Sequence, residues 1–169
     1  AGPIHDGVPP EEIFRSVSHL LFDRTPPEKY ATSFMAAVNP RTGALRYCNA
    51  GHNPALLLRA NGDFDWLEST GMPLGILLEG EFTAGERNLE VNDTLVLYTD
   101  GITEAQNQQG DFFGRQHLLS ILQSEAAAPK SHSRTAPHIQ ETLLAEIHRF
   151  MEMIPLQDDM TLMILVRDL

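Results

Sequence analysis

The 169-residue chain has a single cysteine, Cys48, so it cannot form an internal disulfide. We therefore expect a reducing, cytoplasmic setting and interpret Cys48 as a small strand residue rather than a nucleophile. Long hydrophobic runs are absent too. The apolar stretch Thr161–Val166 is far too short to span a bilayer, so we expect no membrane contact by this domain.

Positive charge is scarce as well. Twelve basic residues stand against 23 acidic residues, which gives a net charge of −11. Nucleic-acid binding needs a basic surface that displaces counterions, so we expect no nucleic-acid partner. The sequence also lacks a Gly-x-Ser-x-Gly elbow and a Gly-x-x-x-x-Gly-Lys-Ser/Thr loop. These absences argue against a covalent serine nucleophile and against nucleotide binding by that loop, and we assign no catalytic side chain.

The length fits one domain, and 42% hydrophobic residues are enough for a substantial core. A helix is predicted from Pro9-Pro10, with an apolar stripe at Ile13, Val17, Leu20 and Leu21. Extended segments bounded by turn residues follow, and they predict an antiparallel sheet. The expected strands are Thr32–Val38, Ala44–Asn49, Ala55–Arg59, Asp63–Leu67, Phe82–Glu90 and Thr94–Thr99, the last two joined by Val91-Asn92-Asp93.

The C-terminal third returns to helical periodicity. Gln116–Gln123 is predicted to be a helix, followed by an exposed connection over Ser124–Arg134. Ile139, Leu143, Ile147 and Phe150 mark a second amphipathic helix. Met160–Val166 is nearly all apolar, as expected of a strand covered on both faces. The order predicts an α+β domain whose last strand inserts into an earlier sheet.

Acidic residues lie at the ends of two predicted buried strands. Asp100-Gly101 follows Thr94–Thr99, with Glu104 four residues after Asp100, and Asp158-Asp159 precedes Met160–Val166. Carboxylates at the mouths of buried strands are costly without a partner, and a divalent cation would stabilise two that converge. Mg²⁺ and Mn²⁺ take oxygen ligands. The alternative is an Asp-Gly turn and an Asp-Asp strand end, and spacing alone leaves both interpretations open.

A third feature is the loop Asn49-Ala50-Gly51-His52-Asn53-Pro54 between two predicted strands. It presents a histidine and two amides. The same residues would also be expected in an ordinary turn with an exposed His52, and this alternative stays open.

Five motifs together carry a resemblance over about Pro9 to Leu169. They resemble, in order and spacing, the stage II sporulation E-type phosphatases of the metal-dependent (protein phosphatase 2C type) family. The motifs are the Asn49–Pro54 loop, Thr70-Gly71-Met72-Pro73-Leu74-Gly75, Leu97-Tyr98-Thr99-Asp100-Gly101-Ile102-Thr103-Glu104, Phe113-Gly114, and Gln157-Asp158-Asp159-Met160-Thr161.

The resemblance implies an antiparallel β-sandwich flanked by helices in α-β-β-α layers, with two Mg²⁺ or Mn²⁺ ions at one end. It implies dephosphorylation of a phosphoserine or phosphothreonine protein in bacteria, such as an anti-sigma-factor antagonist. Carried over by position, Asp100, Gly101, Asp158 and the supporting Asp159 fall in the metal site. His52, Glu104 and Asn49 fall where the family binds substrate or a further metal.

One departure from the family is important. Family members carry, upstream of all these motifs, a Gly-Asp-Phe/Tyr-x-Asp strand that supplies the carboxylate bridging both metals, and this sequence has none. We therefore interpret residues 1–169 as a single phosphatase-type domain without its first strands and first metal motifs. Such a domain would hydrolyse poorly by itself, and its open sheet edges would favour a homodimer. The alternative is a catalytically inactive, phosphatase-like module that binds a signalling partner.

Overall fold

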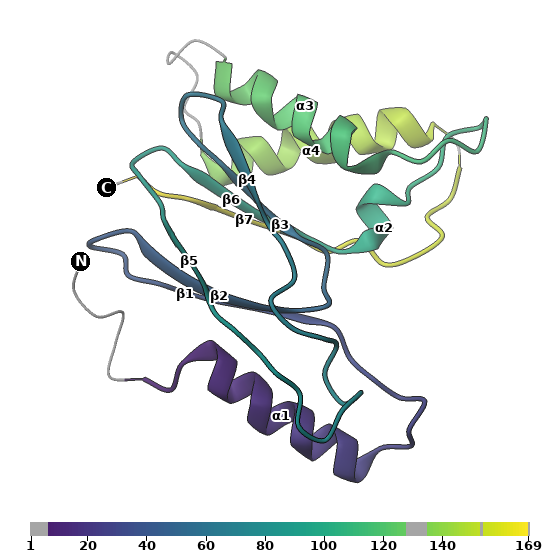
Figure 1. Ribbon diagram of the computed structural model, residues 1–169. Helices are drawn as coiled ribbons and strands as arrows, with labels where there is room; N and C mark the ends of the chain where they lie inside the picture. Colours follow the sequence, from purple (N-terminus) through teal and green to yellow (C-terminus); the bar gives the residue numbers. More distant parts are fainter. Residues whose placement is uncertain (1–6, 128–134, 153, 169) are drawn as a thin grey trace. The chain divides into compact units, whose positions relative to one another are not determined.

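The computed structural model describes residues 7–127, 135–152 and 154–168. The chain forms two compact units, one containing residues up to 54 with 67–89, the other containing 55–66 with 90–168 (Figure 1). Each unit is built on its own antiparallel sheet. The elements are α1 (Pro10–Arg24), β1 (Ser33–Val38), β2 (Ala44–Ala50), β3 (Ala55–Leu58), β4 (Phe64–Leu67), β5 (Gly85–Asn88), β6 (Thr94–Tyr98), α2 (Asp100–Thr103), α3 (Gly114–Ala127), α4 (Ala136–Met151) and β7 (Leu162–Val166).

The first unit holds a three-stranded sheet in the order β1-β2-β5, with α1 packed against β2. Both strand pairs are antiparallel, as the turn residues between the strands predict. Cys48 is fully buried in β2, which confirms its interpretation as a strand residue. One core cluster of this unit is formed by Phe14, Cys48, Ala50, Leu74 and Phe82.

The buried face of α1 differs from the predicted stripe. Phe14 and Ser18 are buried, whereas Val17 and Leu20 are 37% and 55% exposed. Phe14 packs edge-to-face on Phe82, and the small Ser18 lets the backbone N–H of Gly75 reach its hydroxyl at 3.0 Å. Of the predicted stripe, Ile13 and Leu21 are half-buried, and Leu21 packs against the core of this unit.

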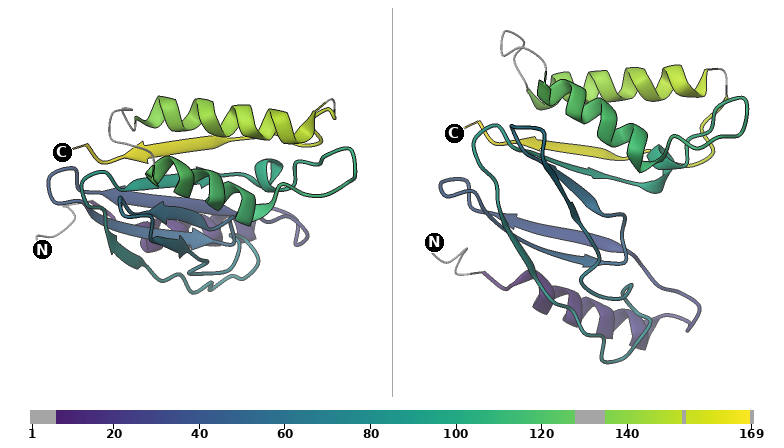
Figure 2. Two further views of the ribbon diagram at one scale, coloured as in Figure 1. Left: turned by 90° about the horizontal axis from the view of Figure 1, so that it is seen from above. Right: turned by 45° about the horizontal axis from the view of Figure 1, so that its top comes forward.

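The second unit holds a four-stranded sheet in the order β4-β3-β6-β7, and α3 and α4 cover one face of it (Figure 2). Leu56, Leu58, Val96 and Tyr98 on the strands contact the two helices through one apolar core. The helices contribute their buried leucine and isoleucine rows to that core, at Leu118, Leu119, Leu122, Ile139, Leu143 and Ile147. The two amphipathic helices of the prediction are therefore confirmed.

Three local predictions were wrong. Strands β5 and β6 do not form a hairpin, because β5 pairs with β2 whereas β6 pairs with β3 and β7. Helix α3 continues through Ala127 into the segment predicted as a connection, since its alanines favour helix; residues 128–134 of that segment lie outside the described part. The last strand is covered on one face only. Met163 and Leu165 are 61% and 36% exposed, because Leu162, Ile164 and Val166 take the face that packs on the helix-covered core and the alternate residues point to the other face.

The class is α+β with antiparallel sheets and helices, as predicted. The last strand does pair with an earlier one, with Leu97 opposite Met163 in the register of β6 and β7. Within the described residues, none of the helices combines the length and the apolar character that crossing a bilayer requires.

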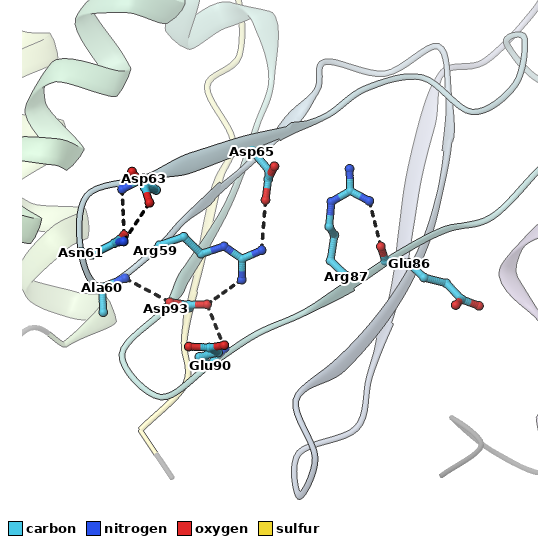
Figure 3. Close-up of polar contacts among 9 residues, drawn as sticks. All are labelled: Arg59, Ala60, Asn61, Asp63, Asp65, Glu86, Arg87, Glu90 and Asp93. Carbon is cyan, nitrogen blue, oxygen red and sulfur yellow. Dashed lines mark hydrogen bonds and ion pairs between the residues drawn. The ribbon is translucent and has the colours of Figure 1, made fainter. Parts of the chain in front are cut away.

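A buried carboxylate organises the turn before β6 (Figure 3). Asp93 is 2% exposed and accepts hydrogen bonds from the backbone N–H groups of Ala60 at 3.0 Å and Glu90 at 2.8 Å. The Arg59 guanidinium donates to Asp93 at 2.8 Å and to the more exposed Asp65 at 3.0 Å. This network joins the β3–β4 connection to the turn that starts β6.

We expect Asp93→Ala to destabilise the chain by about 3 kcal/mol, because Arg59 and two backbone N–H groups would lose a buried acceptor. Asp65→Ala is the matched control. It removes the other carboxylate that contacts Arg59, but Asp65 is 41% exposed and should cost less than about 1 kcal/mol. Urea unfolding of both variants measures the difference. Equal losses would show that the burial of Asp93 is not what stabilises this turn.

Candidate metal centre

Two segments that are distant in sequence meet at one rim of the second unit's sheet. Because β6 and β7 are antiparallel, the end of β6 lies beside the start of β7, with Tyr98 opposite Leu162. Thr99 extends this contact: its hydroxyl donates to the Asp159 carbonyl at 3.0 Å and accepts from the Thr161 N–H at 2.9 Å. Asp100 directly follows Thr99 in sequence, and Asp158 directly precedes Asp159. The sheet therefore brings both acidic segments to the same rim.

The close approach of the two segments depends on Gly101. This residue is buried in the one-turn helix α2. A Cβ atom added to it would lie 2.5 Å from the Asp159 carbonyl oxygen and 3.3 Å from that of Asp158. Only glycine permits this backbone contact. The sequence reasoning placed Gly101 in the site but missed helix α2, for which four residues offer no periodicity.

The two carboxylates are exposed, and among the described residues each uses one oxygen in a hydrogen bond to a backbone N–H. One oxygen of Asp100 accepts from the N–H of Gly101 at 3.1 Å, and one of Asp158 accepts from the N–H of Asp159 at 2.7 Å. Oxygen donors of this kind fit Mg²⁺ or Mn²⁺. However, in the part of the chain that the structure describes, no group of three or more His, Cys, Asp or Glu side chains is placed to hold a metal ion. The ligand type fits, and the described residues supply an incomplete set.

Glu104 lies next to these segments. Its backbone N–H caps α2 by donating to the Asp100 carbonyl at 2.7 Å, and its exposed side chain lines a cavity of about 160 Å³. Gly101 and Asp158 line the same cavity. The structure therefore brings Glu104 to the same rim as the two predicted metal ligands in its unit.

Asn49 and His52 belong to the first unit. Asn49 is fully buried, and both ends of its amide are bonded: Oδ1 accepts from the His52 N–H at 2.8 Å, and Nδ2 donates to the Leu67 carbonyl at 3.3 Å. The amide therefore shapes the loop that carries the half-buried His52. The sequence identified the loop but gave no sign that Asn49 points inward.

The first two family motifs pack on each other in that unit. Gly51 has φ +71°, and a Cβ there would lie 2.6 Å from the Pro73 ring. The Asn49 carbonyl accepts from the N–H groups of Thr70 at 2.9 Å and Gly71 at 3.1 Å. Burial raises the pKa of the neighbouring Cys48 thiol, which keeps it neutral and unreactive.

A family model described as Stage II sporulation protein E (SpoIIE) matches residues 3–168. The chain is 26% identical over 162 residues to the phosphoserine phosphatase RsbU of Bacillus subtilis, covering 95% of this chain and 46% of RsbU. Two solved structures are similar in fold. The RsbU and RsbW domains of Rv1364c from Mycobacterium tuberculosis give a TM-score of 0.75 at 25% identity, over 94% of this chain and 42% of that one. The manganese-soaked phosphatase domain of SpoIIE from Bacillus subtilis gives a TM-score of 0.64 at 18% identity, over 96% of this chain and 68% of that one.

Proposed function

Because the chain belongs to the Stage II sporulation protein E (SpoIIE) family, we propose that it forms part of the phosphatase domain of a bacterial Mg²⁺- or Mn²⁺-dependent protein serine/threonine phosphatase. The observation that carries the proposal is the meeting of Asp100-Gly101 with Asp158-Asp159 at one rim of the sheet. RsbU is described as a phosphoserine phosphatase, and its similarity to this chain covers 95% of this chain. The chain spans less than half of RsbU, so the activity of the whole protein is part of this proposal.

In the proposed mechanism Asp100 and Asp158 hold metal, and Asp159 supports them. A metal held there would supply a water of lowered pKa and would stabilise charge on the phosphoryl group. The residues of this chain would position the two acidic segments that carry the ligands. The Thr99 hydroxyl holds the Asp159 carbonyl, and the missing side chain of Gly101 lets the two acidic segments approach. No side chain of the chain is required as a covalent nucleophile.

We propose as substrate a phosphorylated signalling protein, such as an anti-sigma-factor antagonist, in the cytoplasm. The similarity to RsbU supports the phosphoserine, and the single buried cysteine is compatible with a reducing compartment. Hydrolysis of candidate phosphoproteins by the purified full gene product, and its location after cell fractionation, test this assignment.

We expect the 169-residue chain alone to turn over phosphoserine peptides or aryl phosphates negligibly in the presence of Mn²⁺, because its described residues do not form a three-ligand group. The full gene product should hydrolyse the same peptides. Phosphate release from both proteins, measured side by side with and without a chelator, provides the test. Robust Mn²⁺-dependent turnover by the 169-residue chain would refute the expectation, and inactivity of the full gene product would refute the proposed function.

A second candidate function is a phosphatase-like module that binds a signalling phosphoprotein without hydrolysing it. The observation that favours it is the incomplete ligand group among the described residues. The same assay separates the two functions. A module binds the phosphoprotein but releases no phosphate at any Mn²⁺ concentration, even as the full gene product.

We also propose that the chain forms a homodimer through β7. This edge strand exposes Met163 and Leu165 and carries no charged residue, so it favours pairing with a second copy. We expect sedimentation to show a dimer for the 169-residue chain and a monomer for Met163→Glu. Leu20→Glu, which changes a similarly exposed apolar residue on α1, is the matched control and should stay dimeric. A monomeric wild-type chain at high concentration contradicts the proposal.

A further inference from the structure

The cavity beside the proposed metal ligands has the size of one large side chain. Its volume is about 160 Å³, and cavities of roughly 150 Å³ hold a benzene ring. It is bounded by the segment after α2 and by the segment between α4 and β7. The amide of Gln157 donates to that of Gln106 at 3.1 Å and joins these two walls.

The lining of the cavity includes both apolar and acidic residues. Phe112, Met151 and Leu156 provide apolar surface, and Phe112 and Leu156 are 59% and 51% exposed. Among the described residues that line the cavity, the charged ones are Glu104 and Asp158, both carboxylates. In the described part of the chain no ion pair joins either of them to a basic side chain.

We propose that this cavity receives a lysine or arginine side chain of the phosphoprotein substrate, close in its sequence to the phosphorylated residue. Long basic side chains have an apolar stem and a charged head, and they bury the stem while the head stays at a polar rim. Phe112 and Leu156 would contact the stem, and Glu104 would bind the head. Glu104 is not one of the two proposed metal ligands, so its carboxylate would remain available to a cation in the cavity when Asp158 holds metal.

The basic residue near the phosphoserine is a feature of the substrate, so its assignment rests on the proposed function. Asp158 and Gly101 belong both to the proposed metal site and to the cavity. A side chain in the cavity would therefore lie within a few residues of the phosphoserine. A neutral apolar side chain would leave the carboxylates without a partner, whereas an acidic one would be repelled.

The test uses the full gene product in the presence of a chelator, so that binding is measured without turnover. Fluorescein-labelled phosphoserine peptides carry one lysine, or one glutamine as the matched neutral control, at each position up to about four residues on either side of the phosphoserine. At one or two positions we expect lysine to lower Kd about tenfold relative to glutamine, as measured by fluorescence anisotropy.

Three variants locate the effect. Glu104→Gln and Leu156→Ser should reduce the lysine preference to less than about twofold, whereas Glu141→Gln, which removes an exposed carboxylate of α4 outside the cavity, should preserve it. Absence of a preference at every position overturns the proposal. So does a preference that survives both cavity variants, or one that Glu141→Gln reduces equally, because general attraction to the acidic chain then explains it. Failure to hydrolyse the peptides with Mn²⁺ is a separate result and counts against the proposed function alone.

Discussion

Replacing Asp158 with asparagine in the full gene product should lower kcat/KM for a phosphoserine peptide by about 1,000-fold. Asparagine keeps the shape of the side chain but removes the charge that would hold a divalent cation, which supplies several kcal/mol of transition-state stabilisation. Asp100→Asn should give a loss of the same size, because the two residues meet at one rim of the β6–β7 sheet. The measurement is phosphate release over a range of Mn²⁺ concentrations.

The matched control for this pair is Asp168→Asn. Asp168 is also exposed, but it follows the opposite end of β7, so its carboxylate is far along the strand from the proposed site. We expect its kcat/KM to stay within about twofold of wild type. If Asp158→Asn and Asp100→Asn both retained more than about a tenth of the activity, neither carboxylate would be a metal ligand and the proposed mechanism would be wrong.

Adding a single methyl group at Gly101 should also lower activity strongly, although less than removing a carboxylate. In Gly101→Ala the new Cβ would lie 2.5 Å from the Asp159 carbonyl oxygen, and backbone on one side must move. A displacement of about 1 Å in a catalytic site costs roughly 100-fold in rate. Overpacking of a buried position should also cost about 2 kcal/mol of stability.

Gly110→Ala separates this contact from the general cost of replacing a glycine. A Cβ at Gly110 would meet nothing within 4 Å, and the substitution carries only the cost of φ +83°, about 1 kcal/mol. We expect it to unfold at slightly lower urea and to keep full activity. Both variants are compared by urea unfolding and by phosphate release. Gly101→Ala with wild-type kinetics would show that the approach of the two segments does not matter for the chemistry.

Most strands and the three long helices α1, α3 and α4 could be predicted from local signals. Alternation and turn residues located β1 to β4 and β6 within one or two residues, and the rows of Leu118 and Ile139 located α3 and α4. Local signals did not predict which strands pair with each other. The short connection Val91-Asn92-Asp93 suggested a hairpin, but the buried Asp93 bonds instead to Arg59 and Ala60, and β6 pairs with β3 and β7.

For the candidate site too, the residue types could be predicted from the sequence, whereas the contacts between distant segments could not. Residue types and motif order were sufficient to name Asp100, Asp158 and Glu104, because oxygen ligands at strand ends have a physical reason to be there. Sequence could not reveal that Gly101 makes a close backbone contact with Asp159, nor that the Asn49 amide is hydrogen-bonded to both His52 and the distant Leu67. Both depend on segments that approach only in the folded chain. The role of each residue in binding metal or substrate stays a prediction.

The position of β7 bears on the order in which the protein is made. Its partner β6 ends at Tyr98, and β7 begins at Leu162, so ribosomes synthesise the intervening α3 and α4 before the last strand emerges. The four-stranded sheet, and the rim where the Asp100 and Asp158 segments meet, cannot form on a nascent chain that stops before β7. A translation product that ends after α4 therefore contains Asp100 but lacks Asp158 and the strand that would place it beside Asp100.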